Sequence, residues 1–170
     1  MGLLGETKPV KKPILGVSLY PEQESMEEIE NYLTMASRYG FTKIFTSMFS
    51  VPGTKEEVYD YFKNFCDLAH KHGMKVSGDC NTAFFKKMGA SESDISIFKE
   101  MGIDIIRMDL PYFDQRDVTL INNPYNITIE LSSCMIQAVR MALENGANPK
   151  NFSTCHNFYP ERYTASDLES

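Results

Sequence analysis

The sequence predicts an α/β fold of the TIM (β/α)8-barrel type. Short apolar segments alternate with amphipathic helical segments at a spacing of roughly 30 residues, which is typical of βα units and a parallel sheet. A glycine follows successive helical segments, and each apolar segment has one apolar face and one face that turns polar towards its end. Strands of a doubly wound sheet read as continuous apolar runs, so the polar face favours a barrel with an open mouth.

The chain begins with a polar segment that we do not expect to join the fold. Residues 1–13 read MGLLGETKPVKKP and lack the apolar stretch of a signal peptide. We expect a flexible lead-in here, followed by one partial barrel domain over residues 14–170.

Six strands are predicted from apolar runs and side-chain alternation. In the fourth, Ile106 and Met108 share one face, whereas Arg107 and Asp109 share the other. A half-solvated antiparallel sheet would also alternate, but the intervening helices argue against it. The six predicted strands span residues 14–20, 43–48, 75–79, 103–109, 127–132 and 152–156.

Helix boundaries are marked by capping residues and by glycines. The phrases SMEE (25–28) and TKEE (54–57) are capping boxes, and SESD (91–94) is a weaker version with Asp. His70 and His72 fall in the last turn of the second helix, where a cationic side chain suits the helix dipole, and we interpret both as structural or solvated. Left-handed helix caps are predicted at Gly40, Gly73, Gly102 and Gly146.

The length does not suffice for a complete barrel. A (β/α)8 barrel usually takes roughly 250 residues, whereas this chain has 170. We therefore interpret residues 14–170 as a barrel truncated to about six βα units, without its last strands and any C-terminal domain, and expect this piece alone to be inactive.

Composition excludes several classes of partner. The net charge is −6 and the basic residues are scattered, which argues against nucleic acid. No run approaches the roughly 18 apolar residues of a membrane span. The cysteines show no CxxC spacing and indicate free thiols in a reducing compartment, with the cytoplasm as the default; they are Cys66, Cys80, Cys134 and Cys155.

Polar residues gather where the predicted strands end, and active sites of barrels lie at that end of the strands. Any one carboxylate there could simply cap a helix or a turn. Glu130, between Ile129 and Leu131, needs a buried partner, and Arg107 could supply it in a purely structural Arg–Glu–Asp network. The strand-end residues are Ser18, Tyr20, Ser47, Asp79, Asn81, Arg107, Asp109, Glu130, Ser132, His156 and Asn157.

The functional interpretation is acid–base catalysis by paired carboxylates. Neighbouring parallel strands lie about 4.8 Å apart, so carboxylates on strand ends can approach to roughly 5 to 9 Å, which spans retaining and inverting glycoside hydrolysis. The candidate catalytic residues are Asp79, Asp109 and Glu130.

Other chemistries fit less well, and no cofactor is expected. The sequence lacks a Gly-rich phosphate loop, a GxSxG elbow and a Lys at the carboxyl end of a strand. Cys80, Cys155 and His156 could meet as metal ligands, but no fourth ligand or tight spacing supports this, so no metal is expected.

Five phrases carry a resemblance to a known family. GVSLYPEQESMEE, YGFTKIFTS, IRMD, NPYNITIELS and above all CHNFYPERYT resemble the bacterial 6-phospho-N-acetylmuramidases, over residues 14–164. The resemblance implies a (β/α)8 barrel followed in full-length members by a smaller β-rich domain. It also implies a cytoplasmic glycosidase of cell-wall recycling, which splits phosphorylated MurNAc–GlcNAc into MurNAc 6-phosphate and GlcNAc.

The residues that match this family are polar strand-end residues. They are Asp79, Asp109, Glu130, His156 and Asn157. We expect two of the three carboxyls to be the acid and the nucleophile or base, with Arg107 and His156 tuning them or binding substrate, and Tyr159 stacking on a sugar ring. The expected substrate contacts are Ser18, Tyr20, Asn81, Arg107, Ser132, His156, Asn157 and Tyr159.

The chain departs from the family pattern on loops that line the mouth. DCNTAF replaces an Asp–x–Ser–Pro phrase, Pro111 replaces a glycine, and TASDL replaces TGL. Substrate identity therefore stays open, and two other functions remain. One is a non-catalytic sugar-phosphate-binding barrel, and the other is a metal-dependent barrel hydrolase or isomerase that uses Asp79, Glu130 and His156.

Overall fold

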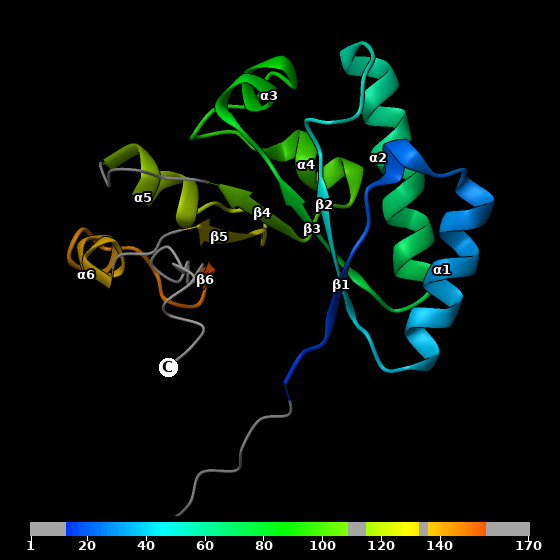
Figure 1. Ribbon diagram of the computed structural model, residues 1–170. Helices are drawn as coiled ribbons and strands as arrows, with labels where there is room; N and C mark the ends of the chain where they lie inside the picture. Colours follow the sequence, from blue (N-terminus) through cyan, green and yellow to red (C-terminus); the bar gives the residue numbers. More distant parts are fainter. Residues whose placement is uncertain (1–12, 109–114, 133–135, 156–170) are drawn as a thin grey trace, which may run out of the picture.

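Six parallel strands form one sheet in which spatial order follows sequence order (Figure 1). The computed structural model describes residues 13–108, 115–132 and 136–155. The strands are β1 (Gly16–Ser18), β2 (Lys43–Ser47), β3 (Lys75–Asp79), β4 (Ile105–Met108), β5 (Thr128–Ser132) and β6 (Phe152–Cys155). Sequential neighbours that run parallel require a crossover between them, and helices supply it.

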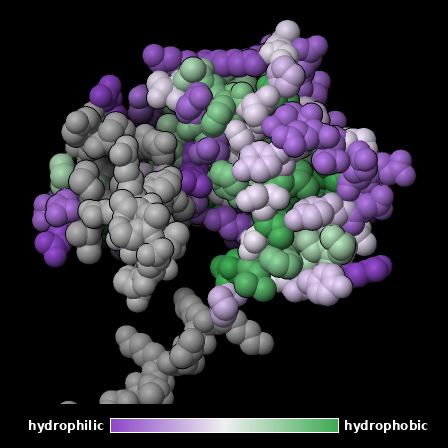
Figure 2. All heavy atoms as spheres, in the orientation of Figure 1, coloured by the Kyte–Doolittle hydropathy of each residue, from purple (hydrophilic) through white to green (hydrophobic). Residues whose placement is uncertain are grey.

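The connecting helices alternate with the strands, which confirms the predicted α/β class. They are η1 (Pro21–Gln23), α1 (Met26–Arg38), α2 (Lys55–Lys71), α3 (Thr82–Lys87), α4 (Ser96–Met101), α5 (Gln115–Ile121) and α6 (Ile136–Glu144). Within the described residues the sheet is open, because β1 and β6 each pair with one strand only. Figure 2 shows hydrophobic atoms beside the start of the described chain, where Ile14 and Leu15 are exposed. No helix in these ranges is long and apolar enough to cross a bilayer.

The face of the sheet towards the helices forms the core. Ile44, Val76, Ile106 and Ile129 lie on this face of four adjacent strands and are completely buried. They belong to one apolar cluster that includes helix residues Leu33, Phe62, Phe65 and Phe98. Residues of opposite parity form what we call the polar face, and they include Lys43, Phe45, Ser47, Ser77, Asp79, Arg107, Glu130 and Ser132. The two-faced strand pattern predicted from the sequence is therefore present.

Two of the three predicted helix starts are confirmed. The side chains of Ser25 and Thr54 each accept a hydrogen bond from the backbone N–H three residues on. In return, the carboxylates of Glu28 and Glu57 accept the backbone N–H groups of Ser25 and Thr54. The third prediction is wrong, because α4 begins at Ser96 and its N-cap residue, Ile95, makes no side-chain hydrogen bond.

The SESD segment makes a local bridge instead of a capping box. The Ser91 and Asp94 backbones exchange hydrogen bonds of 2.9 and 3.1 Å, and the Tyr125 hydroxyl donates to the Asp94 carboxylate. Asp94 Oδ1 also accepts the N–H of Ser96, the first residue of α4, at 3.0 Å. The Asp side chain is thus tied both to the start of α4 and to the chain leading into β5. The strand predicted over residues 14–20 is also shorter than expected, since only Gly16–Ser18 pair with β2.

A carboxylate ties the elements together at the amino end of the sheet. Asp104 Oδ2 accepts the Val76 N–H at 2.9 Å and lies 2.9 Å from His70 Nε2. This contact joins the last turn of α2 to β3 and to the residue before β4, so the structural interpretation of His70 is confirmed.

Two glycines provide a matched test of the helix caps. Gly40 and Gly102 have φ of 83° and 90°, but a Cβ on Gly40 would have no atom within 4 Å, whereas one on Gly102 would lie 2.9 Å from Cys66 Cβ. We expect Gly40→Ala to cost about 1–2 kcal/mol from the left-handed backbone alone. Gly102→Ala should cost about 1–3 kcal/mol more, because it also overpacks the buried Cys66. Urea denaturation measures both, and equal losses would contradict the packing argument.

Candidate active site

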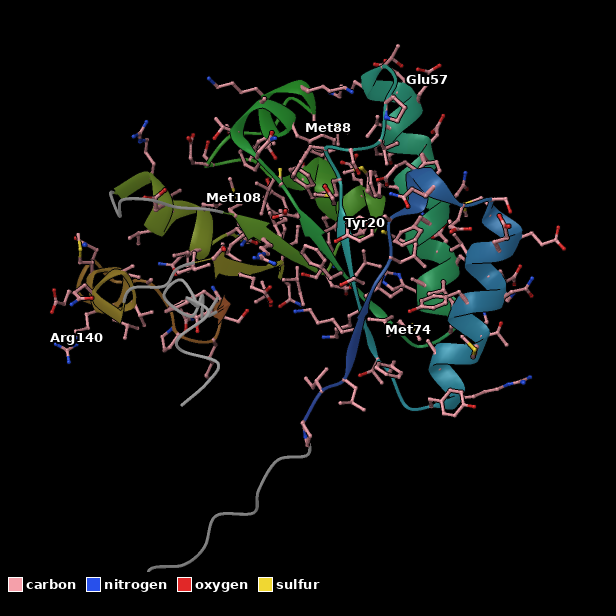
Figure 3. The ribbon with its side chains drawn as sticks, viewed as in Figure 1. Tyr20, Glu57, Met74, Met88, Met108 and Arg140 are labelled. Carbon is pink, nitrogen blue, oxygen red and sulfur yellow. The ribbon has the colours of Figure 1, made fainter. Side chains whose placement is uncertain are left out.

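A cavity of about 180 Å³ lies at the carboxyl ends of β2, β3 and β4. The residues that line it are Phe49, Asp79, Cys80, Asn81, Thr82 and Met108. Figure 3 labels Met108 and Tyr20 at this end of the sheet and Met74 at the opposite end. The carboxyl end of the strands is where barrel enzymes carry their active sites, and two predicted site residues, Asp79 and Asn81, line this cavity.

Asp79 is the last residue of β3, and hydrogen bonds to both neighbouring strands fix its backbone. The Met48 N–H donates to the Asp79 carbonyl at 3.0 Å, and the Cys80 N–H donates to the Arg107 carbonyl at 3.0 Å. The helix cap that Asp79 could have supplied is made by Asn81, whose Oδ1 accepts the Phe84 N–H at 2.8 Å. The cap for α3 therefore comes from Asn81 alone, and Asp79 lines the cavity.

Cys80 gives the cavity an apolar wall rather than a reactive group. Burial, reinforced by the neighbouring Asp79 charge, raises the pKa of the Cys80 thiol to about 12. A thiol with this pKa is neutral at pH 7 and is a poor nucleophile and metal ligand. In the described ranges, no three His, Cys, Asp or Glu side chains are placed to share a metal ion.

Glu130 is buried on the polar face, and its partner is Lys43 rather than Arg107. Lys43 Nζ donates to Glu130 Oε2 at 2.6 Å, with side-chain exposures of 26% and 11%. Lys43 opens β2, whereas Glu130 lies in β5, so the lysine side chain spans the polar face over two intervening strands. The prediction that Arg107 pairs with Glu130 is wrong.

Arg107 adopts a different arrangement on the same face. Its Cζ lies 5.1 Å from the centroid of the Phe45 ring, and its Nη2 donates to Ser132 Oγ at 3.2 Å. Ser77, directly beside Phe45 in register, is small and leaves room for the guanidinium to lie across β3. The Arg107–Glu130 contact of the alternative structural network is thus replaced by a Lys–Glu ion pair and a cation–π contact, and Asp109, its third member, lies outside the described residues.

A second cavity, of about 390 Å³, lies beside the end of β1. It is lined by Ser18, Leu19, Tyr20, Gln23, Glu24, Glu28, Ile29 and Tyr32. The predicted substrate contacts Ser18 and Tyr20 therefore share a cavity of their own, with α1 as its other wall. Four further predicted residues lie outside the described ranges: Asp109, His156, Asn157 and Tyr159.

The chain matches the family model described as 6-phospho-N-acetylmuramidase, N-terminal, over residues 15–170. It belongs to this family. The crystal structure of an uncharacterized B. cereus protein is similar, with 33% identity and a TM-score of 0.71, over 91% of this chain and 41% of that one. A conserved Enterococcus faecalis protein shares 20% identity with a TM-score of 0.68, over 88% of this chain and 40% of that one.

More distant structures share the fold alone. A truncated 3-deoxy-D-arabino-heptulosonate 7-phosphate synthase from Thermotoga maritima has 14% identity and a TM-score of 0.56, over 87% of this chain and 54% of that one. This chain spans about two-fifths of the length of the B. cereus and E. faecalis proteins. No curated protein matches the chain significantly.

Sequence reasoning missed two residues of this 6-phospho-N-acetylmuramidase-family chain. Lys43 lies at the amino end of its strand, where barrel chemistry is not expected, but its parity with Ser47 places it on the polar face. Its long side chain is the signal that could have matched it to the buried Glu130. Phe49 follows β2 by two residues and lines the cavity beside Asp79, and no pattern in the sequence separated it from core aromatics.

The Lys43–Glu130 pair can be tested by a double-mutant cycle. Lys43→Met leaves the Glu130 carboxylate buried without its counter-ion, and Glu130→Gln leaves the ammonium without a charge partner. Because Lys43 is about a quarter exposed, we expect each single change to cost about 1–3 kcal/mol of unfolding free energy. The double variant should cost less than the sum of the two, and additive losses would contradict a direct pair.

Proposed function

We propose that the full-length protein containing this chain is a glycosidase that hydrolyses 6-phospho-MurNAc–GlcNAc in cell-wall recycling. The family supports a 6-phospho-N-acetylmuramidase-type glycosidase. The observation that supports a site for this chemistry is Asp79, whose carboxyl group lines a cavity at the carboxyl end of the sheet. A cytoplasmic location stays a prediction from the sequence.

The catalytic pair belongs, in this proposal, to Asp79, Asp109 and Glu130. A general acid must hold a proton for the leaving group, and a carboxylate oxygen 2.6 Å from an ammonium group is the weakest candidate for that role. We therefore assign the acid to Asp79 or Asp109, and we keep Glu130 as a base or nucleophile that Lys43 positions. Arg107 and Ser132, joined on the polar face beside Glu130, are proposed substrate contacts.

The reaction proposed for these groups is hydrolysis with water as the only co-substrate. The acid gives its proton to the glycosidic oxygen as the bond to the anomeric carbon breaks and GlcNAc departs. The second carboxylate either attacks the anomeric carbon or takes a proton from the water that attacks it. In the first case water then cleaves the glycosyl–carboxylate bond and returns a proton to the first carboxyl, so both groups regain their starting states. In the second case the base holds the proton taken from water, and proton exchange with solvent restores both carboxyls. Either route leaves a hydroxyl on MurNAc 6-phosphate.

The stereochemical outcome tests which pair reacts. Asp79 and Glu130 lie at one register level on β3 and β5, with Arg107 of β4 between them. Two strand spacings, about 9–10 Å, fit the wide separation of inverting enzymes. We expect proton NMR to show the inverted anomer as the first product. Retention would rule out the pair of Asp79 and Glu130, because retaining enzymes need a shorter separation between the two carboxyl groups. The catalytic carboxyls would then come from neighbouring strands, and Asp109 would be one of them.

Turnover by the full-length protein tests the proposed function itself. We expect cleavage of phosphorylated MurNAc–GlcNAc, and losses in kcat of roughly 100-fold or more in Asp79→Asn and Glu130→Gln. Asp104→Asn is the matched control, because Asp104 is a carboxylate at the opposite end of the sheet, hydrogen-bonded to His70 and to the Val76 N–H. It should lower stability and leave kcat unchanged.

Two outcomes would contradict the proposal. Absence of turnover on both phosphorylated and unphosphorylated disaccharide, with binding seen by calorimetry, would favour the non-catalytic sugar-phosphate-binding barrel. Activity of Glu130→Gln near that of the unmodified protein would restrict Glu130 to its structural pair with Lys43.

A further inference from the structure

Phe49 is a large aromatic residue that the fold leaves half exposed. Its relative exposure is 46%, although Met48 beside it is completely buried and Val51 nearly so. Burying a phenylalanine is among the larger apolar gains open to a chain. The turn after β2 therefore buries Met48 and Val51 and leaves Phe49 to line the cavity.

The position of Phe49 is fixed relative to Asp79. The Met48 N–H, one residue before the ring, donates to the Asp79 carbonyl at 3.0 Å. Ser50 Oγ closes the turn on the Ser47 carbonyl at 2.9 Å, and Lys87 Nζ holds the Gly53 carbonyl at 2.7 Å. The turn that carries Phe49 is thus held beside the backbone of Asp79 before any ligand arrives, which lowers the entropy lost on binding.

The residues that line the cavity are of two chemical kinds. Phe49, Met108 and the neutral thiol of Cys80 are apolar, whereas Asp79, Asn81 and Thr82 are polar. A pyranose ring divides in the same way, because its faces carry C–H bonds and its edge carries hydroxyl groups. Ligand sites generally combine aromatic walls with a few placed polar groups of this kind.

We propose that the Phe49 ring stacks on the C–H face of a pyranose bound beside Asp79, and so is a substrate-contact residue of this site. The inference rests on the proposed function for its carbohydrate substrate. The inference deepens that function because it names Phe49 as the residue that holds the face of the sugar. The hydroxyl groups at the edge of the sugar would then meet Asp79, Asn81 and Thr82. Single exposed apolar residues are common on protein surfaces, so a surface role without ligand contact is the competing outcome.

Kinetics of the full-length protein separate these two outcomes. Phe49→Ala should raise KM for the phosphorylated disaccharide roughly tenfold or more, the range found when an aromatic partner is removed from a stacked ring. Phe49→Tyr keeps the ring and should restore KM. Tyr39→Ala is the matched control, because Tyr39 is a 74% exposed aromatic at the end of α1 and lines neither cavity at the strand ends. It should leave KM unchanged.

A fluorescence titration tests binding independently of turnover. The chain has no tryptophan, so Phe49→Trp places an indole at the cavity, and Tyr39→Trp places one far from it. With N-acetylglucosamine and N-acetylglucosamine 6-phosphate as separate probes, we expect a saturable emission change in the Phe49→Trp protein only. The probe that saturates at lower concentration shows whether the stacked sugar carries the phosphate.

The two failures can be told apart. Turnover with an unchanged KM in Phe49→Ala, and no emission change in Phe49→Trp, would overturn the stacking role and leave the glycosidase intact. A saturable emission change without turnover would support the stacking role and contradict the glycosidase. The absence of both would overturn both.

Discussion

The in-register pairing of parallel strands is the constraint on which the rest of this structure depends. It aligns Ser47, Asp79, Arg107 and Glu130 at one level across β2 to β5. Because side chains alternate along a strand, this alignment sends all four to the polar face while Ile44, Val76, Ile106 and Ile129 enter the core. A slip of one residue would exchange the two faces, so the core that stabilises the sheet also fixes the level at which charged groups meet.

Polar groups brought together in this way need partners, and on the polar face these partners come from distant strands. Lys43 of β2 pairs with Glu130 of β5, and the Arg107 side chain of β4 extends across Ser77 of β3 to the Phe45 ring of β2. A pair of buried charges is weak support for stability but expensive to break. The pair links β2 to β5 across β3 and β4, and Asp79 lies at the end of β3 between these two strands.

The sequence predicted the elements that local rules determine, and it failed where long side chains choose their partners. The order of strands and helices, the caps at Ser25 and Thr54 and the left-handed glycines follow from periodicity and backbone sterics, and all appear. The partner of Glu130 could not be predicted, because Arg107 is adjacent in register whereas Lys43 lies three strands away, and Arg107 contacts Phe45 and Ser132 instead. Phe49 was missed because no rule of residue spacing shows which aromatic residue of an apolar run turns away from the core.

Asp79 and Glu130 show how one level of one sheet can give two carboxyl groups different surroundings. Both are strand carboxylates on the polar face, but Glu130 is buried against an ammonium group, whereas Asp79 lines a cavity beside an aromatic ring and a neutral thiol. Opposed surroundings are what allow two carboxyls to take different roles in one reaction. The N–H of Met48, the residue before Phe49, donates to the Asp79 carbonyl, so the backbone of the turn after β2 is held to the end of β3. The turn after β2 and the residues after β3 supply Phe49, Asn81 and Thr82 to the cavity. The strand register therefore sets where these two segments meet.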